Sequence, residues 1–371
     1  MKHLLVDALS VNNLSGRHVL LGHLRELHAA RSQAWRFSFL THRGNAALAQ
    51  DLPEGVAHLQ AGIGAAWWQR AGWGALHFDR LARSRNVDLV FSPAGMLSPG
   101  CSLPQIVLAQ NPLPLMPTAR GLRLRLQRRE FARAQRHAWR MAFNSAYMQD
   151  LYAQQLGPSS RPSIVALQGV DEALYAQEPD GDPQSRAQEI LAVSAMAGHK
   201  AIEVLVDAFA LLAGDRPRLR LTLIGGWPDS AYRQRIEARI GQHGLFARVD
   251  IAGHVDDATL RASYRRARAF CLLSRCESFG IPAIEAQVAG TPTVVAEGTA
   301  APEIAGPGGM VVPQDDPAAA ASALATLLDD DVAWLRYSEA ARRNAGRFHW
   351  SACSEPLTAL LDRFAVQGAG G

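Results

Sequence analysis

The stretch that decides the fold is AFCLLSRCESFGIPAIEAQVAGTPTVVA, residues 269–296. It begins with a short apolar run, passes through a polar loop, and enters a helical pattern at Pro282, where proline suits the first turn of a helix. A second apolar run follows at residues 291–296. Strand, helix and strand in this order form a crossover between parallel strands. The stretch therefore predicts an α/β fold.

The same alternation of apolar runs and helical segments continues through the chain. Continuous apolar runs of this length are typical of parallel strands that are covered on both faces. The runs lie at residues 3–8, 35–42, 56–60, 88–93, 104–110, 141–145 and 163–168, and then at 189–195, 220–226, 248–253, 269–274, 291–296 and 310–313. Two such series predict two Rossmann-like, doubly wound parallel sheets that face a central cleft.

The likeliest joint between the two domains is residues 167–186, which are polar, contain Pro and Gly, and show no periodicity. We therefore expect a first domain over residues 1–168 and a second over residues 169–349. The C-terminal residues 350–371 are expected to form a helix that packs back on the first domain.

Composition excludes several classes of protein. The 371 residues are 48% hydrophobic and 19% charged, which is typical of a soluble globular protein rather than a disordered one. No apolar run approaches the roughly 20 residues of a membrane span, and residues 1–13 lack a signal-peptide cleavage site. The four cysteines, at positions 101, 271, 276 and 353, lack metal-binding spacing. These features predict a cytoplasmic protein with reduced thiols.

Phosphate-binding motifs are informative mainly by what is missing. Neither GxGxxG nor GxxxxGK[ST] is complete, which argues against a nicotinamide oxidoreductase and a P-loop phosphotransferase. Instead, His199 and Lys200 follow an apolar run and open a helical pattern, where free amides and an ammonium group suit an anion. Gly225 and Gly226 follow the next run and would allow close approach of a ligand. The alternative is that Lys200 is a solvated residue and that the glycines only end a strand.

Two glutamates eight positions apart stand in the loop and helix of the opening stretch. Glu277 lies in the loop and Glu285 in the first turns of the helix, so both side chains can face one ligand. A carboxylate accepts hydrogen bonds at two oxygens, which suits neighbouring hydroxyl groups of a sugar. The alternatives are that Glu285 only complements the helix dipole and that Glu277 pairs with Arg275.

With these motifs in view, residues 190–317 resemble the donor-binding domain of retaining GT-B glycosyltransferases of family four, which includes bacterial polysaccharide and lipopolysaccharide transferases. The resemblance is carried by ESFGIPAIEAQVAGTPTVVA, with HKAIEVLVDAFALL, LTLIGG, IAGHV, APEIAG and RFHW in support. The N-terminal half matches more loosely through LSGRHVLLGHL, AQNPLP and FNSAYMQDLY.

The resemblance implies a role for each matching residue. Glu285 would hold the ribose of a nucleotide-sugar, while Glu277 and Lys200 would be the catalytic pair, at the transferred sugar and the diphosphate. Gly16 would lie in a glycine-bearing loop of the first domain that approaches the donor phosphates. The other implied donor- or acceptor-binding residues are Asn111, His199, Gly225, His254, Val255, Phe279, Gly280 and Glu303. The donor would be a GDP-, UDP- or dTDP-sugar. The resemblance also implies retention of anomeric configuration, no cofactor and no metal.

Two positions depart from the family pattern. Ala195 stands where the family often has an arginine, and Gln110 and Asn111 stand where it often presents a histidine. Three functions are therefore weighed: a glycosyltransferase, an inactive nucleotide-sugar-binding protein of the same fold, and a sugar-nucleotide epimerase. The family motifs favour the glycosyltransferase.

A basic segment suggests where the acceptor comes from. Residues 119–140 contain eight arginines and one acid at helical spacing, and Trp67, Trp68 and Trp73 lie close together upstream. Basic amphipathic helices bind anionic bilayer surfaces, and tryptophan favours membrane interfaces. The alternative is a solvated helix with buried tryptophans; nucleic acid is disfavoured because no nucleic-acid motif accompanies the arginines. We expect a peripheral protein on the inner face of the plasma membrane that glycosylates a lipid-linked saccharide for cell-surface glycans.

Overall fold

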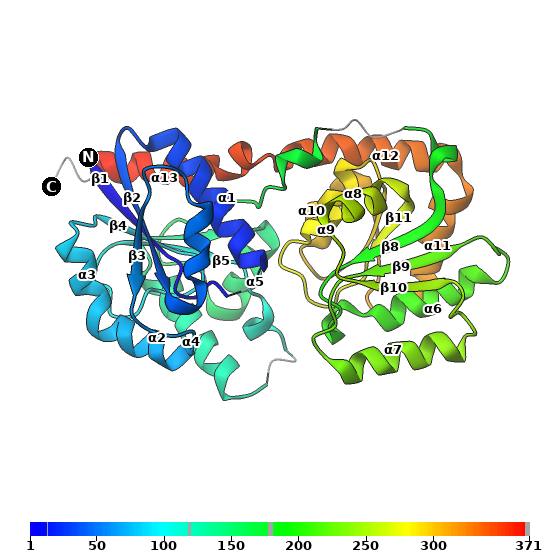
Figure 1. The fold of residues 1–371 in the computed structure, drawn as a ribbon, viewed down its shortest axis with the longest axis horizontal. Helices are drawn as coiled ribbons and strands as arrows, with labels where there is room; N and C mark the ends of the chain where they lie inside the picture. The colour runs from blue at the N-terminus through cyan, green and yellow to red at the C-terminus, as the bar shows by residue number, and fades with distance from the viewer. Residues whose placement is uncertain (13, 118–119, 177–180, 368–371) are drawn as a thin grey trace. The chain divides into compact units, whose positions relative to one another are not determined.

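The computed structural model describes residues 1–12, 14–117, 120–176 and 181–367. The chain forms two compact units. The first comprises Met1–Gly169 together with the segment that begins at Trp350, and the second is Val170–His349. Each unit contains its own parallel sheet with helices on both faces (Figure 1). The two doubly wound sheets predicted from the apolar runs are thus confirmed.

The sheet of the first unit has the strand order β3-β2-β1-β4-β5-β6-β7, and its pairings are parallel. The strands are β1 Lys2–Asp7, β2 Trp35–His42, β3 Ala57–Ala61, β4 Leu89–Ser92, β5 Gln105–Ala109, β6 Arg140–Phe143 and β7 Ile164–Val165. The helices are α1 Leu14–Arg31, α2 Trp67–Trp73, α3 Asp79–Ser84, α4 Leu122–His137, α5 Ala146–Leu156 and α13 Trp350–Gln367.

The C-terminal helix α13 completes the core of the first unit. Its residues Leu357 and Leu361 are buried in the same cluster as α1 and the strands. The indole of Trp350 fills a slot beside two glycines, which have no side chains to occupy it. A Cβ atom on Gly22 would lie 2.3 Å from the indole ring, and one on Gly169 would lie 2.5 Å from it. The slot explains why the chain returns to this unit at Trp350.

Polar contacts reinforce the docking of α13 on α1. Buried His23 hydrogen-bonds through Nδ1 to Ser354 Oγ at 2.9 Å, and its ring meets Trp350 edge to face. At the exposed end, Arg31 donates two hydrogen bonds, of 2.6 and 2.7 Å, to the carboxylate of Asp362. Burial lowers the pKa of His23 to about 3, so its imidazole is neutral at physiological pH.

The sheet of the second unit has the order β10-β9-β8-β11-β12-β13, again with parallel pairings. The strands are β8 Ala187–Val193, β9 Arg220–Ile224, β10 Val249–Gly253, β11 Ala267–Leu272, β12 Thr293–Ala296 and β13 Gly309–Val312. The helices are α6 Ile202–Ala213, α7 Ser230–Gln242, α8 Asp257–Arg266, α9 Ile281–Val288, α10 Ala301–Ala305, α11 Pro317–Asp329 and α12 Asp331–Ala345.

The second unit has an apolar core on each face of its sheet. Helices α6, α7, α11 and α12 contribute to one buried cluster, which includes Phe209, Ile236 and Leu324. Helices α8, α9 and α10 contribute to the other, which includes Tyr264 and Ala283. In Figure 1, helices α6, α7 and α11 lie on the opposite side of the sheet from α8, α9 and α10, while α12 packs against both α9 and α11. Both faces of every central strand are therefore apolar, which is why the strands read as continuous apolar runs.

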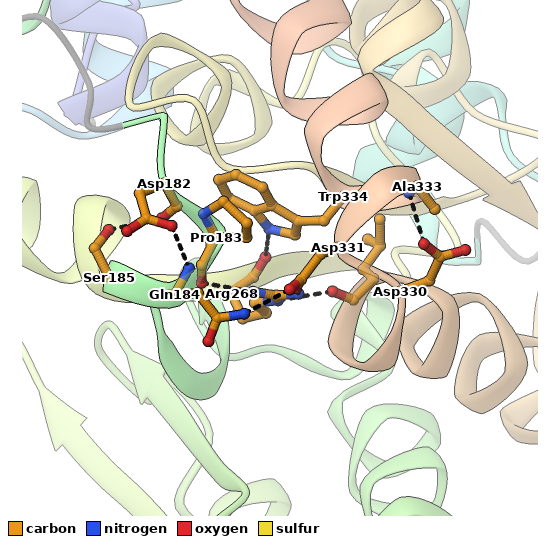
Figure 2. Close-up of polar contacts among 10 residues, drawn as sticks. Asp182, Pro183, Gln184, Ser185, Arg268, Asp330, Asp331, Ala333 and Trp334 are labelled. Carbon is orange, nitrogen blue, oxygen red and sulfur yellow. Dashed lines mark hydrogen bonds and ion pairs between the residues drawn. The ribbon is translucent and has the colours of Figure 1, made fainter.

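A buried arginine fastens the entry of the second unit to its last helices (Figure 2). Arg268 of β11, 2% exposed, donates to the carbonyl oxygens of Leu327 at 2.9 Å and Pro183 at 2.6 Å, and also to Asp331. The indole of buried Trp334 lies against the guanidinium, 5.3 Å from ring centre to Cζ, and donates from Nε1 to the Arg268 carbonyl at 2.8 Å. The guanidinium is thus fully used within the fold.

Candidate functional site

Four loops at one edge of the second sheet carry residues predicted from the sequence. Lys200 follows β8, Gly225 follows β9, His254 follows β10, and Glu277 follows β11. These four strands are neighbours in the sheet. Because parallel strands end at a common edge, where ligands of such sheets bind, the fold gathers all four loops at a ligand-binding position.

Lys200 and Glu277 form an ion pair at this edge. Lys200 Nζ lies 2.5 Å from Glu277 Oε2, and both side chains are 14% exposed. Ser274 Oγ also donates to the same oxygen at 3.5 Å. The pair joins the loops after β8 and β11, and it brings a cation and a carboxylate to one point. The predicted alternative, in which Glu277 pairs with Arg275, is wrong.

Arg275 instead fastens the loop that carries Lys200. Its guanidinium pairs with Glu203 at 2.8 Å and Asp315 at 2.6 Å, and it donates to the Gly198 carbonyl at 3.0 Å. Its backbone amide donates to the His199 carbonyl at 2.8 Å. The hydrogen bond to Asp315 raises the pKa of the guanidinium above its ordinary value. The guanidinium of Arg275 is therefore held by two carboxylates. It does not take the place of the arginine that the family often has at position 195, where this chain has Ala195.

Lys200 lies just before helix α6 rather than in its first turn. A 3₁₀ turn spans Gly198–Lys200, and Ala201 then adopts a left-handed conformation with φ 52°. The helix begins only at Ile202, whose amide donates to Tyr232 Oη at 2.9 Å. The left-handed residue reverses the chain direction, so the expected continuous helix is interrupted. Burial, with Lys200 beside it, lowers the pKa of His199, whose imidazole is neutral near pH 7.

The backbone after β9 requires glycine at position 225. Gly225 has φ +136°, and a Cβ atom there would lie 1.8 Å from the Ser194 carbonyl oxygen. Its amide donates to the Gly253 carbonyl at 2.7 Å. A Cβ on Gly226 would lie 2.5 Å from Nε2 of His254. The loops after β8, β9 and β10 therefore approach each other closely, and at position 225 only glycine fits the backbone.

Glu285 has a different partner from Glu277. Tyr264 of α8 donates a hydrogen bond of 2.7 Å to Glu285 Oε2. Burial raises the pKa of Glu285, and the carboxylates of Asp171 and Asp257 raise it further, whereas the bond from Tyr264 lowers it. The two glutamates of the opening stretch thus have separate partners: an ammonium for Glu277 and a phenol for Glu285.

The remaining predicted residues of the second unit differ in where they lie and in how buried they are. Phe279 is 2% exposed and packs edge to face on Phe348, which corrects the expectation that it contacts a substrate. Gly280, with φ +100°, precedes the first residue of α9. Glu303 lies in the first turn of α10, and Val255 packs against the buried cluster around α8 and α9.

Two predicted residues belong to the first unit. Gly16 lies inside the first turn of α1 and not in the expected loop, because the helix already begins at Leu14. Asn111 follows β5, and its Oδ1 accepts a hydrogen bond from the Leu113 amide at 3.1 Å. Asn111 therefore shapes its own loop.

Sequence reasoning missed one contributor to the site, Tyr264, and used only part of the signal for another, Lys200. Tyr264 carries no signal in the sequence, since its partner lies 21 positions away. A compositional signal for Lys200 was available, because the chain contains only two lysines, Lys2 and Lys200, and uses arginine at every other cationic position. Over the ranges that the structure describes, no group of three His, Cys, Asp or Glu side chains could hold a metal ion. No helix within those ranges is long and apolar enough to cross a bilayer.

Comparison with known proteins agrees with this geometry. Residues 177–345 match the family model described as glycosyl transferases group 1. The D-inositol 3-phosphate glycosyltransferase of Corynebacterium glutamicum is 33% identical over 234 residues, which are 58% of this chain and 54% of that protein. The chain thus spans about half the length of the curated relatives it matches.

Solved structures agree over nearly the whole chain. Sucrose-phosphate synthase of Thermosynechococcus elongatus superposes with a TM-score of 0.77 at 17% identity, covering 99% of this chain and all of that one. Anabaena HepE, solved with UDP and glucose, gives 0.77 at 18% identity over 98% of this chain and all of that one. The fold is therefore GT-B, and the resemblance to GT-B glycosyltransferases is confirmed.

Proposed function

We propose that the protein is a retaining, metal-independent glycosyltransferase that takes a sugar from a nucleotide-sugar donor. The observation that carries the proposal is the ion pair of Lys200 with Glu277, held at the strand ends of a group 1 domain. An ammonium suits the diphosphate of such a donor, and a carboxylate suits sugar hydroxyls. HepE, a structural neighbour, was solved with UDP and glucose, which supports this class of donor.

In the proposed reaction each half of the pair exchanges its partner for the donor. Lys200 neutralises the diphosphate as the bond from the sugar C1 to the phosphate oxygen breaks. Glu277 holds the sugar hydroxyls, and Glu285 holds the ribose. The bond from the acceptor oxygen to C1 forms on the same face, and the acceptor proton passes to the departing phosphate oxygen. Gly225 allows the close approach of the donor, and the base lies near His254 and Val255.

The proposed acceptor is a lipid-linked saccharide, reached from an anionic membrane surface on the cytoplasmic side. Helix α4 buries its C-terminal half through Phe131 and Ala134, while Leu122 and Leu126 are 74% and 42% exposed among exposed arginines. On α2, Trp67 and Trp68 are each 61% exposed. Each arginine near an anionic bilayer contributes about 1 kcal/mol of attraction. Co-sedimentation with phosphatidylglycerol vesicles should fall for a Leu122→Glu, Leu126→Glu variant; unchanged co-sedimentation would exclude this surface.

The donor proposal is tested at the ion pair of Lys200 with Glu277. We expect Lys200→Gln and Glu277→Gln to lose at least tenfold in turnover, and Lys200→Gln also to lose the thermal shift given by UDP, GDP or dTDP compounds. Lys2→Gln is the matched control, because Lys2, the only other lysine, pairs with Asp88 in the first unit. If Lys200→Gln and Lys2→Gln bind and turn over donor equally, the site assignment fails.

A second function is favoured by one observation. Ala195 provides no cation, and the nearby guanidinium of Arg275 is held by Glu203 and Asp315. A protein that binds the donor without transferring its sugar would show a Lys200-dependent thermal shift but no product with any saccharide acceptor.

A further inference from the structure

A group of arginines without carboxylate partners lies at the edge of the first sheet opposite to the strand ends where ligands of such folds bind. Arg140 is the first residue of β6, and Arg161 precedes β7 by three residues, so both are at the amino ends of parallel strands. Arg161 and Arg363 of α13 both lower the pKa of Arg140 by like-charge repulsion, after the effect of burial. Geometry links the same elements: Arg140 lies over the Trp139 ring, and Trp139 packs edge to face on Phe364, the residue after Arg363.

These arginines have unused hydrogen-bond donors. Arg140 donates from Nη1 to the Trp139 carbonyl at 2.7 Å and lies over the Trp139 ring, while its Nε is buried without a partner in the described residues. Within the same part of the chain, the guanidinium groups of Arg161 and Arg363 have no carboxylate within ion-pair distance, and Asp362, next to Arg363, is held by Arg31. The cluster therefore has a local excess of positive charge.

A hollow of about 480 Å³ opens beside Arg161. This volume is in the range of about 300–1,000 Å³ that small-molecule sites occupy. Its lining combines apolar and polar residues from α4, β6, α5 and the loop before β7. The apolar ones are Phe143, Ala153, Pro158 and Pro162, and the polar ones are Gln135, Gln149, Ser159, Ser160, Arg161 and Ser163. Hydroxyl and amide groups of this kind suit the hydroxyl groups of a saccharide.

The loop that lines the hollow is held in place. The side chain of Gln135 on α4 donates from Nε2 to the Gly157 carbonyl at 2.9 Å, and the backbone carbonyl of Gln135 accepts from the Ser160 amide at 3.2 Å. Gln149 of α5 donates to Ser163 Oγ at 2.7 Å. The loop is thus ordered before any ligand arrives, which reduces the entropic cost of binding.

We propose that this hollow and the arginines beside it form a second saccharide site, specific for sugars that carry a phosphate or carboxylate group. The serine and glutamine groups contact the hydroxyls, and the arginines hold the anion. The residues belong to the first unit, whereas the donor residues Lys200, Glu277 and Glu285 belong to the second. The site therefore does not depend on the proposed donor chemistry, and for a glycosyltransferase it would hold an acidic glycan through residues that are separate from the donor residues.

The experiment measures binding to the full chain by calorimetry in a Lys200→Gln background, which removes the phosphate partner of the donor site. The probes are glucose 6-phosphate, glucuronate, glucose and inorganic phosphate. We expect saturable binding of the two acidic sugars, at least tenfold tighter than glucose or phosphate. Adding Arg161→Gln should weaken it about tenfold, about 1.4 kcal/mol. Arg80→Gln, an exposed arginine on α3, is the matched control and should change nothing.

Three results would overturn the proposal: no saturable binding of either acidic sugar, equal affinities in the Arg161→Gln and Arg80→Gln variants, or inorganic phosphate binding as tightly as glucose 6-phosphate. Donor binding is measured separately, in the chain with Lys200 intact. Arg161→Gln should leave UDP affinity unchanged, so failure of the second site is distinguishable from failure of the donor site.

Discussion

At the scale of single residues, the pairing of Lys200 with Glu277 shows how two largely buried charges compensate each other in the free protein. Each ion is largely removed from water, which is costly unless a partner of opposite charge compensates. A nucleotide-sugar would offer a substitute for each partner, an anion for the lysine and hydroxyls for the glutamate. The free protein therefore keeps both groups in place without a ligand.

Gly225 provides the first test at this scale. Gly225→Ala would place a methyl group 1.8 Å from the Ser194 carbonyl in a backbone conformation with φ +136°. We expect a loss of about 1–3 kcal/mol in the free energy of unfolding and at least a tenfold loss in UDP affinity. Chemical denaturation measures the free energy of unfolding, and calorimetry measures the UDP affinity. Gly214→Ala, at a site with open space and φ −53°, is the control; equal effects in both variants would contradict the steric argument.

Tyr264 provides the second test at the scale of single residues. Its hydrogen bond lowers the pKa of Glu285, which burial raises, so Tyr264→Phe should raise that pKa further. If the ionised carboxylate binds the ribose, UDP affinity falls as the pH drops through this pKa, and the fall should begin at a higher pH in the variant. Calorimetry between pH 5 and 8 measures the profile. Superimposable profiles for wild type and variant would remove Glu285 from the donor site.

The sequence predicted residue types better than residue partners. Glu277 and Glu285 were found because their spacing is local, whereas their partners Lys200 and Tyr264 are set by which loops and helices the sheet brings together. Phe279 shows the limit of carrying a motif over: it lies inside the motif but is a packing residue.

At the scale of elements, the apolar runs predicted all thirteen strands of the described residues, because strands covered on both faces need apolar residues throughout. The interruption before α6 was not predictable, since it depends on Ala201 in a left-handed conformation that alanine rarely adopts. The start of α1 was missed for a related reason, because Gly16 suggested a loop where the helix had begun.

The buried arginine of Figure 2 gives a test of how elements are fastened. Arg268→Met would leave the Leu327 and Pro183 carbonyl groups without their donor. We expect a loss of about 2–4 kcal/mol in the free energy of unfolding, measured with urea, because buried acceptors would be unsatisfied. Arg216→Met is the control, because its partner Asp329 is half exposed and such pairs contribute about 1 kcal/mol or less. A smaller loss for Arg268→Met than for the control would refute the role of the buried arginine.

The junction of α1 and α13 gives a pH-dependent test. Burial lowers the pKa of His23 from 6.5 to about 3, so the unfolded chain takes up a proton below pH 6.5 that the folded chain does not. Stability from the neutral imidazole is present above pH 6.5 and is lost as the pH falls from there towards 3. Between pH 6.5 and 5 wild type should lose about 2 kcal/mol more than His23→Gln, measured with urea. His77→Gln, at an exposed site, should behave like wild type; a His23→Gln variant that did so too would contradict the assignment.

At the scale of the whole molecule, each unit has its own sheet and its own apolar cores. We expect two unfolding transitions in urea, reported by tryptophan fluorescence. Because the proposed donor residues all lie in the second unit, UDP at 100 times its dissociation constant should stabilise one transition by about 2.7 kcal/mol and leave the other unchanged. A single transition, or equal shifts of both, would show that the units do not unfold independently.

The slot that receives Trp350 has a further consequence for protein engineering. A Cβ atom on Gly169 would lie only 2.9 Å from the Cα atom of Trp350, so the chain leaves the first unit and re-enters it at nearly the same point. The intervening 180 residues are thus topologically an insertion between Gly169 and Trp350 of a Rossmann-like scaffold. Splicing Gly169 to Trp350 through a short glycine linker should close that scaffold, and the excised segment should be usable as a portable module for grafting.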